Sequence, residues 1–226
     1  PKTLLEVGGK PVLYRMLSHI RAVGIKDIIM VLGYLEGQIK DYIRENFSDL
    51  NICYTYNYSY AATNTAFSLL LAENFVGNST FIKFDADVVF DKEILTRLIN
   101  CKYPNCLCID KNINLAAEEI KIVLGDQNKV LEAGKAVDPA LAAGESIGIE
   151  KIDGQTAPVL FAELRDMMKN PNNYQKYYES AYESLIGKNV AFHALDITGL
   201  RWPEIDTMED RSAAEALFAE APFPTA

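Results

Sequence analysis

Apolar residues follow two alternating patterns along the first half of the chain. Short β-prone runs, such as residues 28–32 and 81–84, alternate with stretches like 12–23, where apolar residues return every three or four positions. The first pattern is typical of buried strands and the second of amphipathic helices. Strands that alternate with helices of this length predict βαβ units. We therefore expect an α/β fold with a Rossmann-like mixed, mostly parallel sheet, helices on both faces and a small added lobe.

The predicted elements of the first half are helices at about 12–23, 36–47, 64–72 and 92–101, and strands at about 28–32, 51–57, 81–84 and 105–109. Past Asp110 the pattern changes to a hairpin, because strand-like runs at 119–124 and 129–132 flank a turn rich in Gly, Asp and Asn. The remaining predicted elements are a strand at 146–152, helices at 156–169 and 174–186, a strand at 190–196 and a closing helix at 208–219.

Two carboxylates stand directly after the apolar run Phe81–Phe84, at Asp85 and Asp87. In an open parallel sheet, ligands bind outside the carboxyl ends of the strands. A regular strand would place both side chains on one face, whereas a bent strand end would direct only one of them at a ligand. A metal or phosphate site and a simple Asp-rich turn are both compatible with this run.

Composition restricts the kinds of partner. The net charge of −9 argues against a general nucleic-acid or anionic-membrane surface, but it leaves room for a small anionic ligand held by a few lysines, backbone amides and a metal. No apolar run approaches the roughly 20 residues that span a bilayer, and no basic and apolar leader opens the chain. The four cysteines form no paired C-x-x-C motif, and His19 and His193 lie in apolar segments. We expect a cytoplasmic, reduced protein.

A series of short motifs runs through the chain. They are Pro1-Lys2-x-Leu4-Leu5-x-Val7-x-Gly9-Lys10-Pro11, Asn57, Thr63-Asn64-Thr65, Asp85-Ala86-Asp87, Gly134-Lys135, Gly144-Glu145-Ser146-Ile147-Gly148-Ile149 and Trp202-x-Glu204-Ile205-Asp206. In this order they resemble nucleoside triphosphate transferases of the sugar-nucleotide pyrophosphorylase superfamily. The Thr-Asn-Thr helix start and the Glu-Ile-Asp ending are most similar to the phosphocholine and aminoethylphosphonate cytidylyltransferases. The resemblance covers nearly the whole chain.

The resemblance implies an enzyme, a cytidylyltransferase. A phosphate or phosphonate oxygen of a small amino-alcohol acceptor would attack the α-phosphorus of CTP, and pyrophosphate would leave. Such a transfer depends on charge neutralisation and alignment. By the resemblance, Asp87 and Asp206 hold Mg²⁺ and Lys2 contacts phosphate. Asp206 has a second interpretation as N-cap of the closing helix, with Glu209 completing a capping box.

Two further groups of site residues follow from the resemblance. Nucleotide contacts are expected from Asn64, Thr65 and Asp85, although helix capping explains the first two equally well. The acceptor is expected to contact Lys135, Glu145, Tyr178, Glu179, Trp202 and Glu204. In this interpretation a trimethylammonium or ammonium head lies between Tyr178 and Glu204. The same tyrosine belongs to an aromatic stripe at helical spacing, which is also typical of a core.

One departure from the family pattern concerns the start. In the family a first strand and a Gly-rich loop, G-x-G-x-R, precede the Pro-Lys pair, whereas this chain begins at Pro1. We expect residues 1–226 to be a single, N-terminally truncated nucleotidyltransferase domain. Its parts are a nucleotide-binding core of about 1–110, a substrate lobe of about 111–200 and a closing helix of about 207–220. A homodimer is compatible with the sequence. Alternatives are a sugar 1-phosphate or inositol phosphate nucleotidyltransferase, or a non-catalytic ligand-binding module that lacks the loop.

Overall fold

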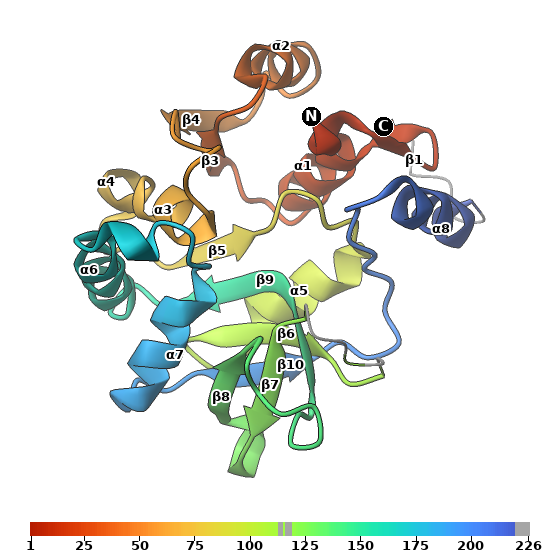
Figure 1. Ribbon diagram of the computed structural model, residues 1–226. Coiled ribbons are helices and arrows are strands. Elements are labelled where there is room, and N and C mark those ends of the chain that lie inside the picture. The colour runs from red at the N-terminus through yellow and green to blue at the C-terminus, as the bar shows by residue number, and fades with distance from the viewer. Residues whose placement is uncertain (113–114, 116–118, 220–226) are drawn as a thin grey trace.

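The computed structural model describes residues 1–112, 115 and 119–219, and these form a mixed α/β fold (Figure 1). Its main sheet has the strand order β10-β6-β9-β7-β8, and β5 also pairs with β9. The strands are β5 (Phe81–Phe84), β6 (Cys106–Asp110), β7 (Lys121–Leu124), β8 (Val130–Gly134), β9 (Gly144–Ile152) and β10 (His193–Asp196). The predicted closing helix reached residue 220, which lies outside the described residues, as do parts of the predicted lobe at 113–114 and 116–118.

Strand β9 organises the main sheet. It runs antiparallel to β5, β6 and β7, and of the described pairings in this sheet only β10 with β6 is parallel. The register pairs Phe84 of β5 with Ile149 of β9, and Asp110 of β6 with Glu145 of β9. The mixed sheet is confirmed, but it is less parallel than the βαβ pattern predicted. The reason is that β9 enters from the hairpin lobe and runs against its neighbours.

A second, two-stranded sheet consists of β3 (Asp27–Leu32) and β4 (Asn51–Tyr56), which are parallel and joined through α2 (Glu36–Asn46). Among the described strands, β3 pairs only with β4, and β5 pairs only with β9. A cavity of about 1340 Å³ lies between β3 and β5. Its lining is largely apolar and includes Leu13, Met16 and Ile20 of α1 (Val12–Ala22). This cavity separates the two sheets.

Helices cover both faces of the main sheet, as expected. Alternate residues of β6 explain why: Leu107 and Ile109 pack toward α6 (Ala157–Met168) and α7 (Glu179–Gly187), whereas Cys106 and Cys108 pack toward α1 and α5 (Lys92–Asn100). Two short helices, α3 (Thr65–Leu70) and α4 (Glu73–Val76), flank the first of these cores. The cysteines therefore serve as packing residues.

The termini of the described chain meet at a third, smaller core. Strands β1 (Glu6–Val7) and β2 (Lys10–Pro11) form a small hairpin against α8 (Met208–Phe218) (Figure 1). Val7, Val89 and Phe218 are all buried there. This packing brings the first residues, including the 3-10 turn Lys2–Leu4, next to the segment that precedes α8.

Most elements match their predicted ranges within a few residues, but α7 begins at Glu179 rather than at 174. The carbonyls of Tyr174 and Lys176 accept hydrogen bonds from the backbone amides of Asn64 and Ala66, so they are engaged by the start of α3 instead of a helix of their own. The short 3-10 turn Pro171–Asn173 precedes them. In the described part of the chain, no helix has the length and apolar character needed to span a membrane.

Candidate active site

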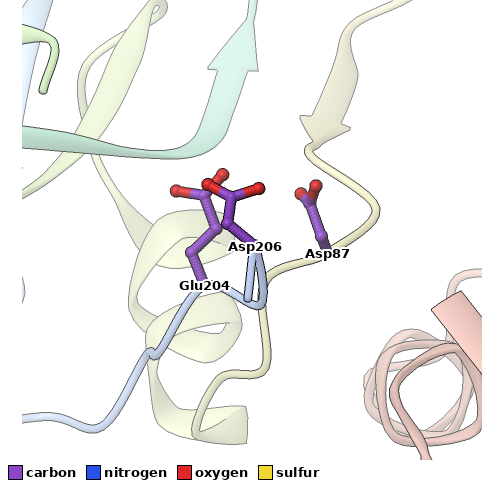
Figure 2. A group of neighbouring side chains, drawn as sticks. All are labelled: Asp87, Glu204 and Asp206. Atoms are coloured by element: carbon purple, nitrogen blue, oxygen red, sulfur yellow. The ribbon is translucent and has the colours of Figure 1, made fainter. Parts of the chain in front are cut away.

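Three carboxylates converge beside the end of β5: Asp87, Glu204 and Asp206 (Figure 2). Each offers one oxygen, and these oxygens lie within 4.8 Å of one another. The backbone explains the convergence, because residues 87–89 run against 203–205. The amide of Val89 donates to the carbonyl of Pro203 (2.9 Å), and the amide of Ile205 donates to the carbonyl of Asp87 (3.1 Å). The approach of Asp87 to Asp206 was predicted, whereas the participation of Glu204 in this cluster was not.

Lys2 supplies the positive charge that faces this cluster. Its Nζ lies 2.5 Å from Oδ1 of Asp206 and 4.0 Å from Oδ2 of Asp87. Burial lowers the pKa of Lys2, but the hydrogen bond to Asp206 and the charges of Asp206, Asp87 and Glu204 outweigh burial and raise it. Lys2 is therefore a permanent cation at the cluster.

The carboxylates exceed the positive charge around them. Burial, followed by the charge of Asp85, raises the pKa of Asp87, and burial together with Asp87 and Asp206 raises the pKa of Glu204 to about 7. The direction of both pKa shifts agrees with the geometry, in which three neighbouring carboxylates face the single positive charge of Lys2. Three carboxylate oxygens at this spacing suit a hard divalent cation such as Mg²⁺ or Ca²⁺.

The alternative role of Asp206 as a helix cap is wrong. Thr207 is the N-cap of α8: its hydroxyl accepts from the amide of Asp210, and the carboxylate of Asp210 accepts from the amide of Thr207. Glu209 is not the partner in this capping box. The side chain of Asp206 is consequently left to Lys2 and the carboxylate cluster.

Asp85 points away from this cluster, so the two neighbouring aspartates have separate environments. Strand β5 ends at Phe84, and a turn follows at Ala86 and Asp87. Oδ2 of Asp85 accepts from Nζ of Lys83 (2.8 Å) and from the hydroxyl of Tyr178 (3.0 Å). Gly148 of β9 has φ +72°, and a Cβ on it would lie 2.2 Å from the same oxygen, so this close approach requires glycine. The bent strand end directs only Asp87 at the carboxylate cluster.

Tyr178 is buried inside the lobe and not at the cluster. Its hydroxyl lies 3.0 Å from both Oδ2 of Asp85 and Oε1 of Glu150, and Nζ of Lys83 lies 3.4 Å from its ring centroid. Only 1% of the residue is exposed. The ring packs in the core and is covered by Lys83, but Tyr178 also lines the cavity that contains Asp87, so its contact with the acceptor stays a prediction.

Asn64 and Thr65 are engaged in joining α3 to the lobe. The side chain of Asn64 accepts from the amide of Thr65, and the hydroxyl of Thr65 accepts from the amide of Tyr178 (3.2 Å). Thr65 also lines the large cavity, along with Lys83, Asp85 and Asp87. The capping interpretation accounts for their observed contacts, and of the two only Thr65 lines the cavity that contains Asp87.

Glu145 and Trp202 both lie next to Asp110, the last residue of β6. Glu145 is buried on β9, and burial with the charges of Glu119, Asp110 and Glu204 raises its pKa to about 7. Nε1 of Trp202 donates to Oδ2 of Asp110 (2.8 Å). These side chains thus continue the acidic environment from the carboxylate cluster onto the sheet.

Lys135 and Glu179 line a separate pocket of about 310 Å³ between β8 and α7. Nζ of Lys135 lies 4.3 Å from the ring centroid of Tyr177. This pocket has no lining residue in common with the cavity that contains Asp87. The structure therefore brings these two predicted residues together with each other, away from the cluster.

Two residues of this region were missed from the sequence. Lys83 stands two positions before Asp85 in an apolar strand, a spacing that places both on one face and was a usable signal. Asp110 ends the apolar strand β6 just as Asp85 follows β5, and this parallel was also visible. Neither Lys83 nor Asp110 belongs to one of the motifs that identified the other site residues.

The comparison with families of proteins gives a match that covers just over half of the chain and includes Asp87 but not Lys2, Glu204 or Asp206. A family model described as "Domain of unknown function (DUF6564)" matches residues 6–132. CMP-5'-(3-aminopropyl)phosphonate synthase of Streptomyces rubellomurinus is 25% identical over 228 residues, which cover 97% of this chain and 36% of that protein. CTP:phosphoglutamine cytidylyltransferase of Campylobacter jejuni is 28% identical over 234 residues, which cover 93% of this chain and 89% of that protein.

Solved structures resemble this one over almost its whole length. CTP:phosphocholine cytidylyltransferase from Streptococcus pneumoniae superimposes with a TM-score of 0.75 at 24% identity, covering 96% of this chain and 90% of that one. This likeness confirms the Rossmann-like fold. The similar proteins and solved structures are nucleotidyltransferases, as the sequence motifs predicted.

Proposed function

We propose that this chain, which belongs to the family described as "Domain of unknown function (DUF6564)", is an enzyme that transfers CMP from CTP to a small amino-alcohol phosphate or phosphonate and releases pyrophosphate. The observation that carries the proposal is the convergence of Asp87, Glu204 and Asp206 with Lys2. Similarity to proteins named for CMP transfer to phosphorylated or phosphonate compounds supports the choice of reaction.

The cluster would hold one Mg²⁺ through Asp87 and Asp206, with Glu204 as a third candidate ligand. When bound, the ion neutralises charge that develops on transferring phosphoryl oxygens. Lys2 contributes a second, fixed positive charge for phosphate oxygens. These residues align the acceptor's phosphate oxygen with the α-phosphorus and screen the repulsion between two anions, which is the main requirement of phosphoryl-type transfer.

The acceptor would extend from the cluster toward Glu204, Glu145 and Trp202. The acidic character of this direction supports a positively charged group on the acceptor. Tyr178 has no part in this proposal because its ring and hydroxyl are engaged by Lys83, Asp85 and Glu150. Asp85 would act indirectly, by shaping the turn that carries Asp87.

The cavity between β3 and β5 would be filled by a further strand in the working enzyme, followed by a Gly-rich loop that binds the triphosphate. Two strand edges without a partner among the described strands support this, as does the apolar lining of the cavity. The backbone amides of such loops form anion-binding concavities. The loop would stand at the Asp87 end of the cavity, where Thr65 and Ser68 also contribute to the lining.

Pyrophosphate release tests the proposed function. The full-length natural protein is assayed with each of four nucleoside triphosphates and with phosphoethanolamine, phosphocholine, aminoethylphosphonate or glucose 1-phosphate, in the presence of Mg²⁺. Release with CTP and an amino-alcohol phosphate or phosphonate is expected. Release that requires a sugar phosphate instead, or none with any combination, contradicts the proposal.

A further inference from the structure

Glu145 has an oxygen whose hydrogen-bonding capacity is unused in this structure. The residue is 6% exposed, and its Oε2 is buried without a hydrogen-bond partner. A buried acceptor in this state costs about 1–3 kcal/mol of desolvation. Because buried polar groups are nearly always satisfied, an unpartnered carboxylate oxygen beside a candidate active site indicates a donor that arrives with a ligand.

The sheet surrounds Glu145 with charged neighbours. In the strand register it lies opposite Asp110 of β6 on one side and Lys121 of β7 on the other. The carboxylates of Glu119, Asp110 and Glu204 are close enough to raise its pKa. Four carboxylates therefore gather around Lys121, with Lys2 acting on Glu204 alone among them, and this excess of negative charge favours a cationic ligand.

The carboxylates around Glu145 differ in whether their oxygens already accept hydrogen bonds. Oδ2 of Asp110 accepts from Nε1 of Trp202, and its Oδ1 accepts from the amide of Asn112 (2.9 Å). Oε2 of Glu119, by contrast, is buried without a hydrogen-bond partner, like Oε2 of Glu145. Oε2 of Glu119 and Oε2 of Glu145 therefore each require an N–H or O–H donor. A positive charge without such a donor would leave both oxygens without a hydrogen bond.

We propose that Glu145 and Glu119 bind the head of the acceptor through N–H groups, so that the enzyme selects a primary ammonium over a quaternary one. This inference rests on the proposed function. A primary ammonium carries three donors, whereas a trimethylammonium carries none and would leave both oxygens unsatisfied.

The aromatic residues of the region agree with this preference. Quaternary ammonium groups are recognised chiefly by exposed aromatic faces. The face of Tyr178, the ring expected to receive a quaternary head, is covered by the ammonium of Lys83. Since Glu204 stands in the carboxylate cluster and also acts electrostatically on Glu145, a short acceptor can reach Asp87 with its phosphate while its head reaches Glu145.

A series of acceptors that differ only in methylation tests this proposal: phosphoethanolamine, its N-methyl and N,N-dimethyl derivatives, and phosphocholine. With the full-length enzyme, CTP and Mg²⁺, kcat/KM is expected to fall with each N–H lost, by roughly tenfold or more across the series. Ethyl phosphate, which lacks the head, measures the contribution of the phosphate alone. Equal or better use of phosphocholine overturns the inference.

The variant Glu145→Gln tests whether Glu145 is the residue that recognises the ammonium head. This variant should lower kcat/KM for phosphoethanolamine by roughly tenfold or more while leaving ethyl phosphate unchanged, and Glu132→Gln, an exposed carboxylate on β8, should change neither. Equal losses for both acceptors in Glu145→Gln would contradict the inference. If Glu145→Gln does not fold, the methylation series on the unmodified enzyme still decides. Absence of pyrophosphate release with every acceptor would instead contradict the proposed function.

Discussion

The ammonium of Lys83 lies 3.4 Å from the centroid of the Tyr178 ring. Tyr178 is buried and the Lys83 side chain is only 10% exposed, and the same lysine forms ion pairs with Asp85 (2.8 Å) and Glu150 (3.4 Å). The protein therefore uses this aromatic face for a cation of its own. The cluster joins β5, β9 and the start of α7, so its main role is to fix these three elements relative to one another.

Tyr178→Phe is expected to reduce the free energy of unfolding by about 1–3 kcal/mol, because it removes the hydroxyl that lies 3.0 Å from both Asp85 and Glu150 and leaves a buried hydrogen-bonding atom unpaired. Denaturant unfolding measures the loss, and Tyr177→Phe, an exposed neighbour, serves as the control. The ratio of kcat/KM for phosphoethanolamine to that for ethyl phosphate should stay constant. A selective loss of the aminated acceptor would restore Tyr178 as an acceptor contact.

Stability should fall as pH rises through the neutral range. Burial raises the pKa of Glu150 from 4.5 to about 8, with Asp85 and Glu179 adding to the shift and Lys83 opposing it. A carboxyl with a raised pKa in the folded state binds more protons when folded, so the contribution of Glu150 to stability is fully present below about pH 4.5 and is lost as pH rises toward 8. Glu150→Gln should flatten this decline, as measured by urea unfolding at several pH values.

The control for that experiment is Glu93→Gln, an exposed residue of α5 that should leave the pH dependence intact. A decline just as steep in Glu150→Gln as in the unmodified protein would show that other groups, such as Glu145 or Glu204, dominate it.

Asp87→Asn and Asp206→Asn should each lower turnover by roughly a hundredfold or more, since each removes a charged candidate ligand of the metal. Stability should change little or rise slightly for Asp87→Asn, because the raised pKa of this residue shows that its charge is unfavourable in the folded protein without a metal. Asp166→Asn, exposed on α6, is the matched control. Similar turnover in all three variants would exclude the carboxylate cluster from catalysis.

The variant Lys2→Met separates the effect of the lysine charge on metal binding from its effect on turnover. It should tighten Mn²⁺ binding by roughly fivefold or more, because the Lys2 ammonium pairs with Asp206 and lies beside Asp87, and even two unit charges about 4 Å apart in water repel by about 1 kcal/mol. Turnover should nevertheless fall by roughly tenfold or more, since the phosphate loses a cationic contact. Paramagnetic resonance titration measures the first quantity and pyrophosphate release the second. Weaker metal binding in this variant would mean that Lys2 organises the cluster instead of competing with the metal.

Nucleotide affinity tests the need for a strand and loop at the cavity. Calorimetry with this chain of 226 residues alone should give a Kd for CTP of about 1 mM or weaker, because its sequence contains no G-x-G-x-R loop to hold the triphosphate. A chain extended by a strand and a Gly-rich loop should bind far more tightly. Micromolar affinity of the unextended chain would contradict the prediction.

The order of helices and strands was accessible from the sequence because each has a clear apolar period and suitable end signals. The direction of β9 was not, since periodicity reports which face is buried and not which way a strand runs. In the same way, the tyrosines at 174–182 have helical spacing, but contacts with Asn64 and Ala66 determine where α7 begins.

The sequence predicted only part of the candidate site. Motifs identified Asp87 and Asp206, whose approach depends on a short ladder between two segments that are more than one hundred residues apart. No local pattern could place Glu204 in the same cluster or direct Asp85 away from it. Those outcomes depend on the turn after β5 and on the close packing of Gly148, which are tertiary features.

The open edges of β3 and β5 have a consequence for how the protein behaves in solution. Backbone amides that face the cavity have no partner among the described strands, so they should exchange with deuterium quickly, whereas amides in the centre of β9 should be protected. Open edges also accept strands from other molecules. Concentration-dependent self-association, moderated by the net charge of −9, is therefore expected whenever the cavity is left unfilled, and filling it should abolish both the association and the fast exchange.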